Sequence, residues 1–333
     1  MSESIDESFN QQEEYKMARY VKISCLSAPF LRAGPETDLE EVVTRMIGHW
    51  EHRLEQVLPD RPDLIVLPEC CDRPERAGYT YERLKEYYRY RGDRIRDFFA
   101  GVARDHRCYI AYAAIRALPD GTFRNSTQLL DRSGNVAGVY NKNHLVEGEC
   151  TQGGMLYGKD APVFETDFGR VACAICFDLN FDGLRERYAR QKPDLILFSS
   201  AYHGGLMQQY WAYSCRAHFA GAINTHAPSA IISPVGEIIA QSTNYYHYVT
   251  RTINLDCEVI HIDYNEEHFR SIKNKYGPKV RIHDPGLLGS VLISSETDEF
   301  NVQDVIREFG LELLDDYWER AKAHRCSPGN MEM

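Results

Sequence analysis

The sequence contains no run of eighteen apolar residues, so it offers no candidate for a membrane-spanning helix. Its first seventeen residues are polar and acidic, without the basic start and apolar core of a secretory leader. A segment with so few apolar residues cannot bury enough surface to fold. We therefore expect residues 1–17 to be a disordered acidic tail and the protein to be cytoplasmic, with no membrane partner.

Positive charge is also scarce, because 38 lysines and arginines stand against 49 aspartates and glutamates, for a formal net charge of −11. An acidic surface is repelled by nucleic acid phosphates and by anionic lipids. The composition therefore argues against nucleic acid as a partner, as it does against a membrane surface.

The ten cysteines lack the spacing of a structural zinc site. Cys173 and Cys176 form one C-x-x-C pair and Cys70 lies beside Cys71, but no second pair has zinc-finger spacing. A chain of this length buries roughly 75% of the surface that its unfolded form exposes, so disulfides are not needed to stabilise it. We expect reduced thiols and no metal.

The sequence does contain short apolar runs that alternate with longer amphipathic segments, as is typical of an α/β fold. Residues 20–25 alternate with the period of a strand, 38–58 carry apolar residues at helical spacing, and 63–67 form the apolar run of a buried strand. Further strands are predicted at 109–116, 126–131, 136–141, 170–175, 194–199, 229–233, 237–241 and 250–255, and further helices at 81–105, 182–191, 207–222 and 301–320.

Two short segments are nearly identical: Arg-Pro-Asp-Leu-Ile at 61–65 and Lys-Pro-Asp-Leu-Ile at 192–196. Each precedes a predicted buried strand, which suggests that the chain consists of two related halves. Helices that flank mixed sheets give a layered α/β sandwich. The pattern leaves the structure of residues 257–294 undetermined.

Three segments carry side chains suited to catalysis, and each also has an ordinary structural explanation. Glu69 follows the apolar strand 63–67, where strand ends of α/β proteins build sites, although taken alone an exposed loop carboxylate or salt-bridge partner is the more common explanation. Lys142 ends the strand 136–141 close to two carboxylates, either to stabilise an oxyanion or as a solvated surface charge.

Cys176 lies where the strand 170–175 meets a helix. A thiol on such a turn would receive helix N–H groups, which lower its pKa and can bind an oxyanion. Free cysteine is also a common small buried residue, and we expect this of Cys173 in the middle of the strand.

The order of these three residues, with the motifs around them, resembles the nitrilase or carbon–nitrogen hydrolase superfamily. The resemblance is carried by Leu67-Pro68-Glu69, by Tyr-Asn-Lys-Asn-His-Leu at 140–145, by the run from Gly169 to Cys176, and by Ser-Ala-Ile-Ile-Ser-Pro-Val-Gly at 229–236. It covers residues 20–256.

This resemblance implies a four-layer αββα sandwich of two mixed β-sheets, with a hydrolase domain at 18–295 and a C-terminal helix and tail at 296–333 that packs on a partner subunit. It implies a catalytic triad of Glu69, Lys142 and Cys176 and needs no cofactor or metal. A second carboxylate lies beside the triad in many members; segment similarity favours Glu149 here, with Glu147 as its rival.

The sequence Cys176-Phe177-Asp178 resembles the amidase and carbamoyl-hydrolase branches, whereas nitrile specialists usually have Cys-Trp-Glu. We therefore expect a small amide or N-carbamoyl substrate, with the backbone N–H of Phe177 as a second oxyanion donor. Two departures from the family leave substrate recognition open: Arg-Ala-His-Phe-Ala at 216–220, and no Arg or Pro near 180–182.

Tyr202 and His203, after the strand 194–199, are candidate substrate-binding residues, with exposed loop positions as the alternative. We also expect a homodimer or larger oligomer, because the predicted helix 207–222 carries four aromatic residues, Tyr210, Trp211, Tyr213 and Phe219. Rival functions are a papain-like Cys–His enzyme, a catalytically silent scaffold and a thioredoxin-like redox protein.

Overall fold

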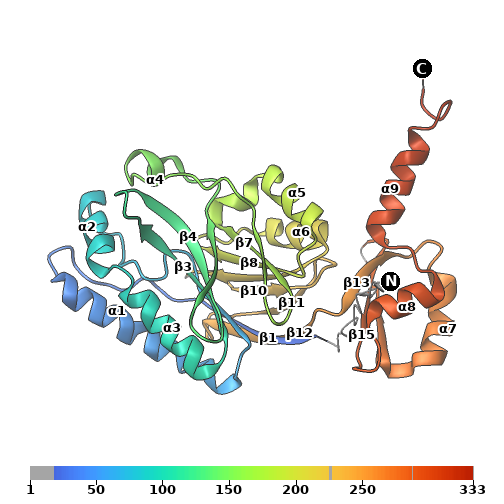
Figure 1. The fold of residues 1–333 in the computed structure, drawn as a ribbon, viewed down its shortest axis with the longest axis horizontal. Coiled ribbons are helices and arrows are strands. Elements are labelled where there is room, and N and C mark those ends of the chain that lie inside the picture. The colour runs from blue at the N-terminus through green and yellow to red at the C-terminus, as the bar shows by residue number, and fades with distance from the viewer. Residues whose placement is uncertain (1–18, 225–226, 287, 333) are drawn as a thin grey trace, which may run out of the picture.

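The computed structural model describes residues 19–224, 227–286 and 288–332. The acidic tail predicted for residues 1–17 lies outside the described residues. Two six-stranded mixed sheets face each other, and helices cover the outer face of each sheet (Figure 1). The predicted four-layer αββα sandwich of two mixed β-sheets is confirmed.

The first sheet has the strand order β12-β1-β2-β3-β4-β5, in which β1, β2 and β3 are parallel and the other pairs antiparallel. Its strands are β1 (Tyr20–Leu26), β2 (Leu64–Val66), β3 (Tyr109–Ala117), β4 (Phe123–Leu130), β5 (Val136–Asn141) and β12 (Tyr248–Asn254). Helices α1 (Leu39–Leu54), α2 (Tyr81–Arg91) and α3 (Arg94–His106) cover its outer face.

The second sheet repeats this plan with the order β11-β10-β9-β8-β7-β6, and its strands β7, β8 and β9 are parallel. Its strands are β6 (Val163–Glu165), β7 (Arg170–Ile175), β8 (Leu195–Ser200), β9 (His218–Ile223), β10 (Ala230–Ile232) and β11 (Ile238–Gln241). Helices α5 (Asp182–Gln191) and α6 (Leu206–Cys215) cover this sheet, and the short α4 (Glu147–Thr151) lies in the connection after β5.

The repeated pentapeptide marks a structural repeat. Arg61 and Lys192 both have left-handed backbones, with φ of 52° and 50°. In each half, the following aspartate accepts a backbone N–H of the neighbouring strand, from Lys22 to Asp63 at 2.9 Å and from Arg170 to Asp194 at 2.7 Å. The same local chemistry therefore starts β2 in one sheet and β8 in the other.

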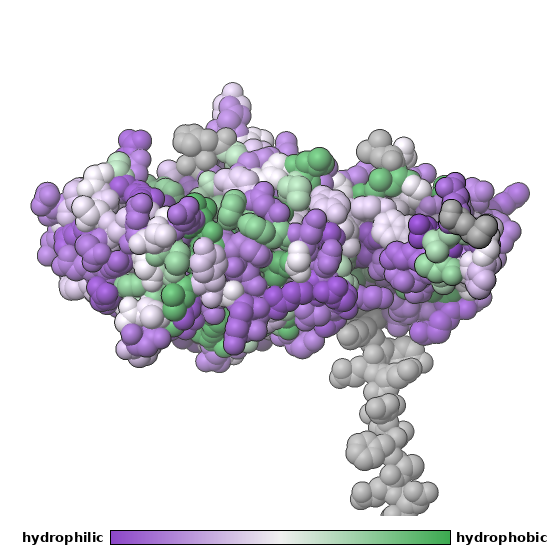
Figure 2. Space-filling view, turned by 90° about the horizontal axis from the view of Figure 1, so that it is seen from above, coloured by the Kyte–Doolittle hydropathy of each residue, from purple (hydrophilic) through white to green (hydrophobic). Residues whose placement is uncertain are grey.

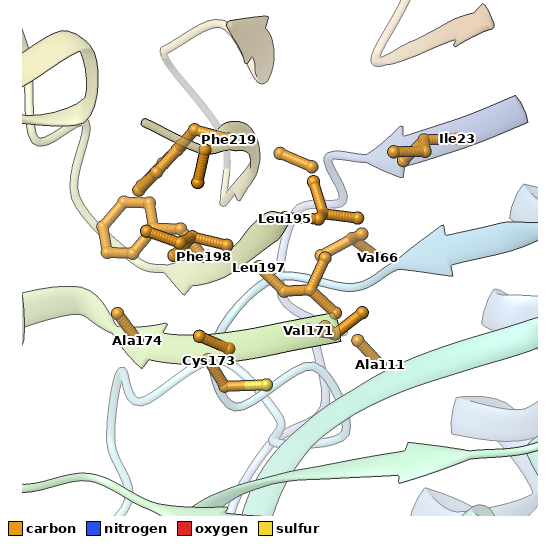
Figure 3. Close-up of a cluster of buried hydrophobic side chains, with 14 of the residues drawn as sticks. Ile23, Val66, Ala111, Val171, Cys173, Ala174, Leu195, Leu197, Phe198 and Phe219 are labelled. Atoms are coloured by element: carbon orange, nitrogen blue, oxygen red, sulfur yellow. The ribbon is translucent and has the colours of Figure 1, made fainter. Parts of the chain in front are cut away.

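The main core lies between the two sheets. Side chains from both sheets meet there in one buried cluster, part of which is drawn in Figure 3. It includes Ile23, Val66 and Ala111 from the first sheet and Val171, Cys173, Leu195 and Leu197 from the second. This packing fixes the two sheets against each other and with them the strand ends that carry the candidate site.

Within the sandwich, two predicted helices are wrong in their extent. The helix predicted over 81–105 is divided into α2 and α3 by Gly92, whose φ is 52°. The helix predicted over 207–222 ends with α6 at Cys215, because Arg216 takes a left-handed backbone (φ 54°) and the chain continues as strand β9. Phe219 is therefore a buried strand residue rather than part of an aromatic helix surface.

Residues 257–309, which include the stretch left undetermined by the sequence, form a small unit with its own core. Strands β13 (Cys257–His261), β15 (Ser290–Ser295) and β14 (Val280–His283) make an antiparallel sheet, on which α7 (Glu266–Tyr276) and α8 (Val302–Phe309) pack. The single helix predicted over 301–320 is wrong, since Gly310 (φ 62°) ends α8 and α9 (Leu314–Arg325) follows. Helix α9 points away from the rest of the molecule (Figure 1).

The face shown in Figure 2 is mainly polar, with apolar residues scattered in small groups. Among the helices that the structure describes, none combines the length and the hydrophobicity needed to cross a bilayer.

Candidate active site

Lys142 and Glu69 are buried together at the edge of the sandwich where β2 and β7 end. The Lys142 ammonium donates hydrogen bonds to Glu69 Oε1 and to Glu149 Oε2, both at 2.8 Å. Only 1% of Lys142 is exposed and 4% of Glu69. The structure thus brings Glu149 to Lys142, whereas Glu147 is exposed.

Asn125 holds the two carboxylates side by side, a role that the sequence analysis missed. Its Nδ2 donates to Glu69 Oε1 at 2.8 Å and to Glu149 Oε1 at 2.9 Å. The remaining oxygen of Glu69 accepts the backbone N–H of Ala201 at 3.1 Å. Each carboxylate is therefore fixed by several donors and cannot rotate freely.

Cys176 follows β7 directly and has a left-handed backbone, with φ of 48°. It starts a short 3₁₀ helix (Cys176–Asn180). A non-glycine residue rarely adopts this conformation, and such strain is frequent where a side chain must be presented from a turn. The side chains of Glu69 and Ser200 lie close enough to the thiol to shift its pKa, so all three residues of the predicted triad are brought together. Cys173, in contrast, is fully buried within β7, as predicted.

The charges of the cluster decide its protonation. Burial alone would raise the pKa of Glu69, but the charge and hydrogen bond of Lys142 outweigh it and lower that pKa below its ordinary value. Burial would likewise lower the pKa of Lys142, but Glu69 and Glu149 hold it well above the ordinary range. At neutral pH the Glu69 carboxylate and the Lys142 ammonium are therefore charged.

The Cys176 thiol, in contrast, is neutral. Burial first, and then the charge of Glu69, raises the pKa of Cys176 to about 12. The expectation that helix N–H groups lower this pKa is therefore wrong, because the turn offers a single 3₁₀ segment while burial and a carboxylate act in the opposite direction. A neutral thiol beside an ionised carboxylate can react only if its proton leaves during attack.

Asp178 ties the Cys176 turn to the Lys142 loop. Its carboxylate is fully buried and accepts the backbone N–H of Ile175 at 3.0 Å, the hydroxyl of Tyr140 at 2.7 Å and the backbone N–H of His144 at 2.9 Å. One side chain thus holds Ile175, which precedes Cys176, together with Tyr140 and His144, which lie two residues before and after Lys142. Sequence analysis quoted Asp178 only as a branch marker and missed this contact.

The candidate substrate residues are placed unequally. Phe177 and Tyr202 lie together at the surface beside Cys176, because Asn180 Nδ2 donates to the Phe177 carbonyl at 3.0 Å and to the Tyr202 hydroxyl at 3.4 Å. His203 is exposed, and its ring accepts the backbone N–H of Gly205 at 3.1 Å. No hydrogen bond or ion pair joins His203 to the triad among the described residues. Within the same residues, no three His, Cys, Asp or Glu side chains are grouped as metal ligands would be.

The chain is similar in sequence to a known family of enzymes. A sequence model of the carbon–nitrogen hydrolases matches residues 34–262. The chain is 23% identical over 250 residues to the omega-amidase NIT2 of Danio rerio, and the match covers 68% of this chain and 88% of that one.

Two solved structures share the fold. A carbon–nitrogen hydrolase from Helicobacter pylori G27 superposes with a TM-score of 0.62 at 15% identity, covering 78% of this chain and 94% of that one. A variant of the amidase from Nesterenkonia sp. AN1, with acrylamide added at its active-site cysteine, gives a TM-score of 0.55 at 14% identity over 77% and 99% of the two chains. With more than half of its length matched by the family model, the chain belongs to the carbon–nitrogen hydrolases of the nitrilase superfamily.

Proposed function

We propose that this protein hydrolyses the carbon–nitrogen bond of a small amide or N-carbamoyl compound through a thioester on Cys176. The observation that carries the proposal is the buried Lys142 ammonium, shared between Glu69 and Glu149 beside the Cys176 thiol. Burying an ammonium between two carboxylates costs desolvation free energy. The stabilisation of an oxyanion is a function that would explain why the protein keeps this arrangement.

In the first half of the reaction, the Cys176 sulfur attacks the carbonyl carbon while Glu69 takes the thiol proton. The carbonyl oxygen becomes an oxyanion, for which the Lys142 ammonium and the Phe177 backbone N–H are the donors. Glu69 then gives its proton to the departing nitrogen, the carbon–nitrogen bond breaks, and ammonia or an amine leaves. The acyl group remains on Cys176 as a thioester.

In the second half, Glu69 takes a proton from a water molecule, whose oxygen attacks the thioester carbon. The carbon–sulfur bond breaks, the acid product leaves, and the Cys176 sulfur recovers the proton from Glu69. Glu149 keeps Lys142 in place throughout and exchanges no proton with the substrate. These steps need no cofactor and no metal, and both absences stay predictions.

Amides and N-carbamoyl compounds are favoured over nitriles because Phe177 and Asp178 follow the nucleophile, in place of the Trp-Glu that is usual in nitrile specialists. The relative from Danio rerio and the structural neighbour from Nesterenkonia are also both amidases. The experiment is a panel of primary amides, N-carbamoyl amino acids and nitriles, followed by ammonia release. Turnover of nitriles alone would replace the amide assignment. No turnover, together with no selective thiol labelling, would favour the catalytically silent scaffold.

The pH profile is expected to show the acid limb of Glu69 and no thiol limb. Glu69 must be ionised to accept the proton, and its pKa lies below the ordinary 4.5, so kcat/KM should stay constant from neutral pH down to about 5 and fall below it. Because the pKa of the Cys176 thiol is about 12, kcat/KM should not rise between pH 7 and 10. Circular dichroism at each pH checks that the protein stays folded. An acid limb near pH 6.5 would instead indicate a histidine base, as in a papain-like enzyme.

We also propose a cytoplasmic homodimer or larger oligomer. All ten cysteines are free thiols, as suits a reducing compartment. Tyr210 and Tyr213 are the aromatic residues of α6 that remain available for a subunit contact, because Trp211 is fully buried in α6 and Phe219 in β9. Helix α9, largely exposed from Trp318 onward, is the segment that we expect to pack on a partner subunit. Light scattering that gives a monomer mass at micromolar concentration would contradict this proposal.

A further inference from the structure

Asn125 completes a closed ring of hydrogen bonds with Lys142 and the two site carboxyl groups. It lies near the start of β4, on the face that turns toward the second sheet, because side chains alternate along a strand and Leu129, four residues on, lies in the core between the sheets. The Asn125 backbone carbonyl accepts the Lys142 N–H at 2.8 Å. Asn125 and the residue that follows β5 therefore lie side by side.

The ring joins Glu69 to Glu149 through two donors. Lys142 Nζ donates to Glu69 Oε1 and Glu149 Oε2, and Asn125 Nδ2 donates to Oε1 of both glutamates. A primary amide nitrogen carries two hydrogens, so it can serve both acceptors at once. The Asn125 amide is thus the neutral bridge between the two carboxyl groups.

Only these two bonds orient the Asn125 amide. Its Oδ1 is buried and has no hydrogen-bond partner among the described residues. A flipped amide is unfavourable, because Oδ1 would then face the ionised Glu69 oxygen, and neither atom could donate. The side chain is therefore fixed by what it donates to the site.

The ring decides which oxygen of Glu69 is open to a proton. Oε1 accepts from both Lys142 and Asn125, which uses the two lone pairs of that oxygen. Oε2 accepts the backbone N–H of Ala201 at 3.1 Å and keeps its second lone pair for the Cys176 proton. Proton transfer to Oε2 breaks no bond of the ring, so Lys142 and Asn125 keep their places while the oxyanion forms.

We propose that Asn125 is a positioning residue: together with Lys142 it holds Glu69 Oε1, so that Oε2 is the oxygen that removes and returns the Cys176 proton. The proposal rests on the proposed function and leaves its steps unchanged. The proton moves from Sγ to Oε2 as the carbon–sulfur bond forms, and from Oε2 to the departing nitrogen as the carbon–nitrogen bond breaks. Asn125 itself gives up no proton.

Asn125→Ala should lower kcat on the best amide on the order of thirtyfold and leave KM within about threefold, because Glu69 loses an orienting bond and the substrate loses no contact. Thr127→Val is the matched control. Thr127 lies on the same face of β4, is 1% exposed, and its hydroxyl has no hydrogen-bond partner among the described residues. This control should leave kcat and KM unchanged. A kcat of Asn125→Ala within about threefold of the parent would overturn the proposal.

Asn125→Asp separates positioning from a merely structural role. The introduced carboxyl group has the shape of the amide, and it faces Glu69, Glu149, the Lys142 ammonium and the Cys176 thiol. Burial and the charge of Glu69 raise its pKa, while Lys142, already shared by two carboxyl groups, opposes this.

Below that raised pKa the introduced group is protonated and can donate to Glu69 Oε1, and above it the group is ionised and repels Glu69. The kcat/KM of Asn125→Asp should therefore be highest near pH 5 to 6 and fall by roughly tenfold or more toward pH 9, where the parent profile stays flat. A structural role predicts the same loss at every pH, and that result would overturn the proposal.

If the parent hydrolyses no amide, the proposed function fails, and the rate of Cys176 alkylation by iodoacetamide, followed by peptide mass, decides on Asn125. Labelling that is about tenfold slower in Asn125→Ala, with Thr127→Val equal to the parent, supports the proposal, because a misplaced Glu69 removes the thiol proton less readily. Equal or absent labelling in the parent and Asn125→Ala overturns it.

Discussion

Replacing Cys176 with alanine should abolish amide hydrolysis, with a loss of turnover of roughly 10⁵-fold or more, because no other group can form the acyl intermediate. The variant should stay folded, since Cys176 is only partly buried and follows β7 rather than lying within it. Ammonia release on the best amide measures the first expectation and circular dichroism the second.

Cys173→Ala is the matched control for this experiment, since Cys173 lies three residues earlier on the same strand and is fully buried. Removing a buried sulfur should cost about 1 kcal/mol of stability and leave kcat within a few-fold. Iodoacetamide that inactivates the enzyme while labelling another cysteine and sparing Cys176 would refute the assignment.

Lys142→Met should lower turnover by a factor of about a thousand or more, because the ammonium is the proposed donor that stabilises the oxyanion in the transition state. Lys142→Arg should not restore activity, since a larger planar fork cannot occupy the place of an ammonium that lies 2.8 Å from both carboxylates. The measurement is kcat on the best amide, well below the melting temperature of each variant.

Lys142→Met should also destabilise the fold by about 3 kcal/mol or more, because it leaves Glu69 and Glu149 facing each other without a cation. The double variant with Glu149→Gln returns the cluster from two net negative charges to one, as in the parent. Stability should then recover in part while turnover stays low, which separates charge balance from catalysis. A rate within tenfold of the parent in Lys142→Met would make Lys142 a structural charge.

The sequence predicted three residues that the structure brings together in the candidate site, because their signals are local. Glu69, Lys142 and Cys176 each end a strand, and in an α/β sandwich such ends meet at one edge. The repeated Pro-Asp-Leu-Ile likewise marks β2 and β8 correctly, since its aspartate makes the same backbone contact in both halves.

Elements without a local signal were missed. The run that continues from α6 into β9 is rich in apolar and aromatic residues on both sides of Arg216, and periodicity cannot separate a buried helix from a buried strand. Its break falls at Arg216, a residue that does not usually mark a left-handed turn.

The partners inside the site were beyond sequence analysis for a similar reason. Asn125 reaches Glu69 across 56 positions of the chain, and Asp178 reaches Tyr140 across 38. The thiol pKa also depends on burial and on the Glu69 charge, and the sequence supplies neither quantity. Only the folded arrangement indicates that Cys176 is neutral at rest, which is why we propose Glu69 as the group that removes its proton.

The most direct test of the account is to trap the acyl-enzyme. The enzyme is mixed with its best amide, quenched in acid within one turnover and digested, and the peptides are weighed by mass spectrometry. The account predicts the mass of the acyl group on the peptide that contains Cys176, with no adduct in the Cys176→Ala variant. Ammonia release without any adduct on that peptide, or an adduct on another residue that accounts for turnover, would contradict it.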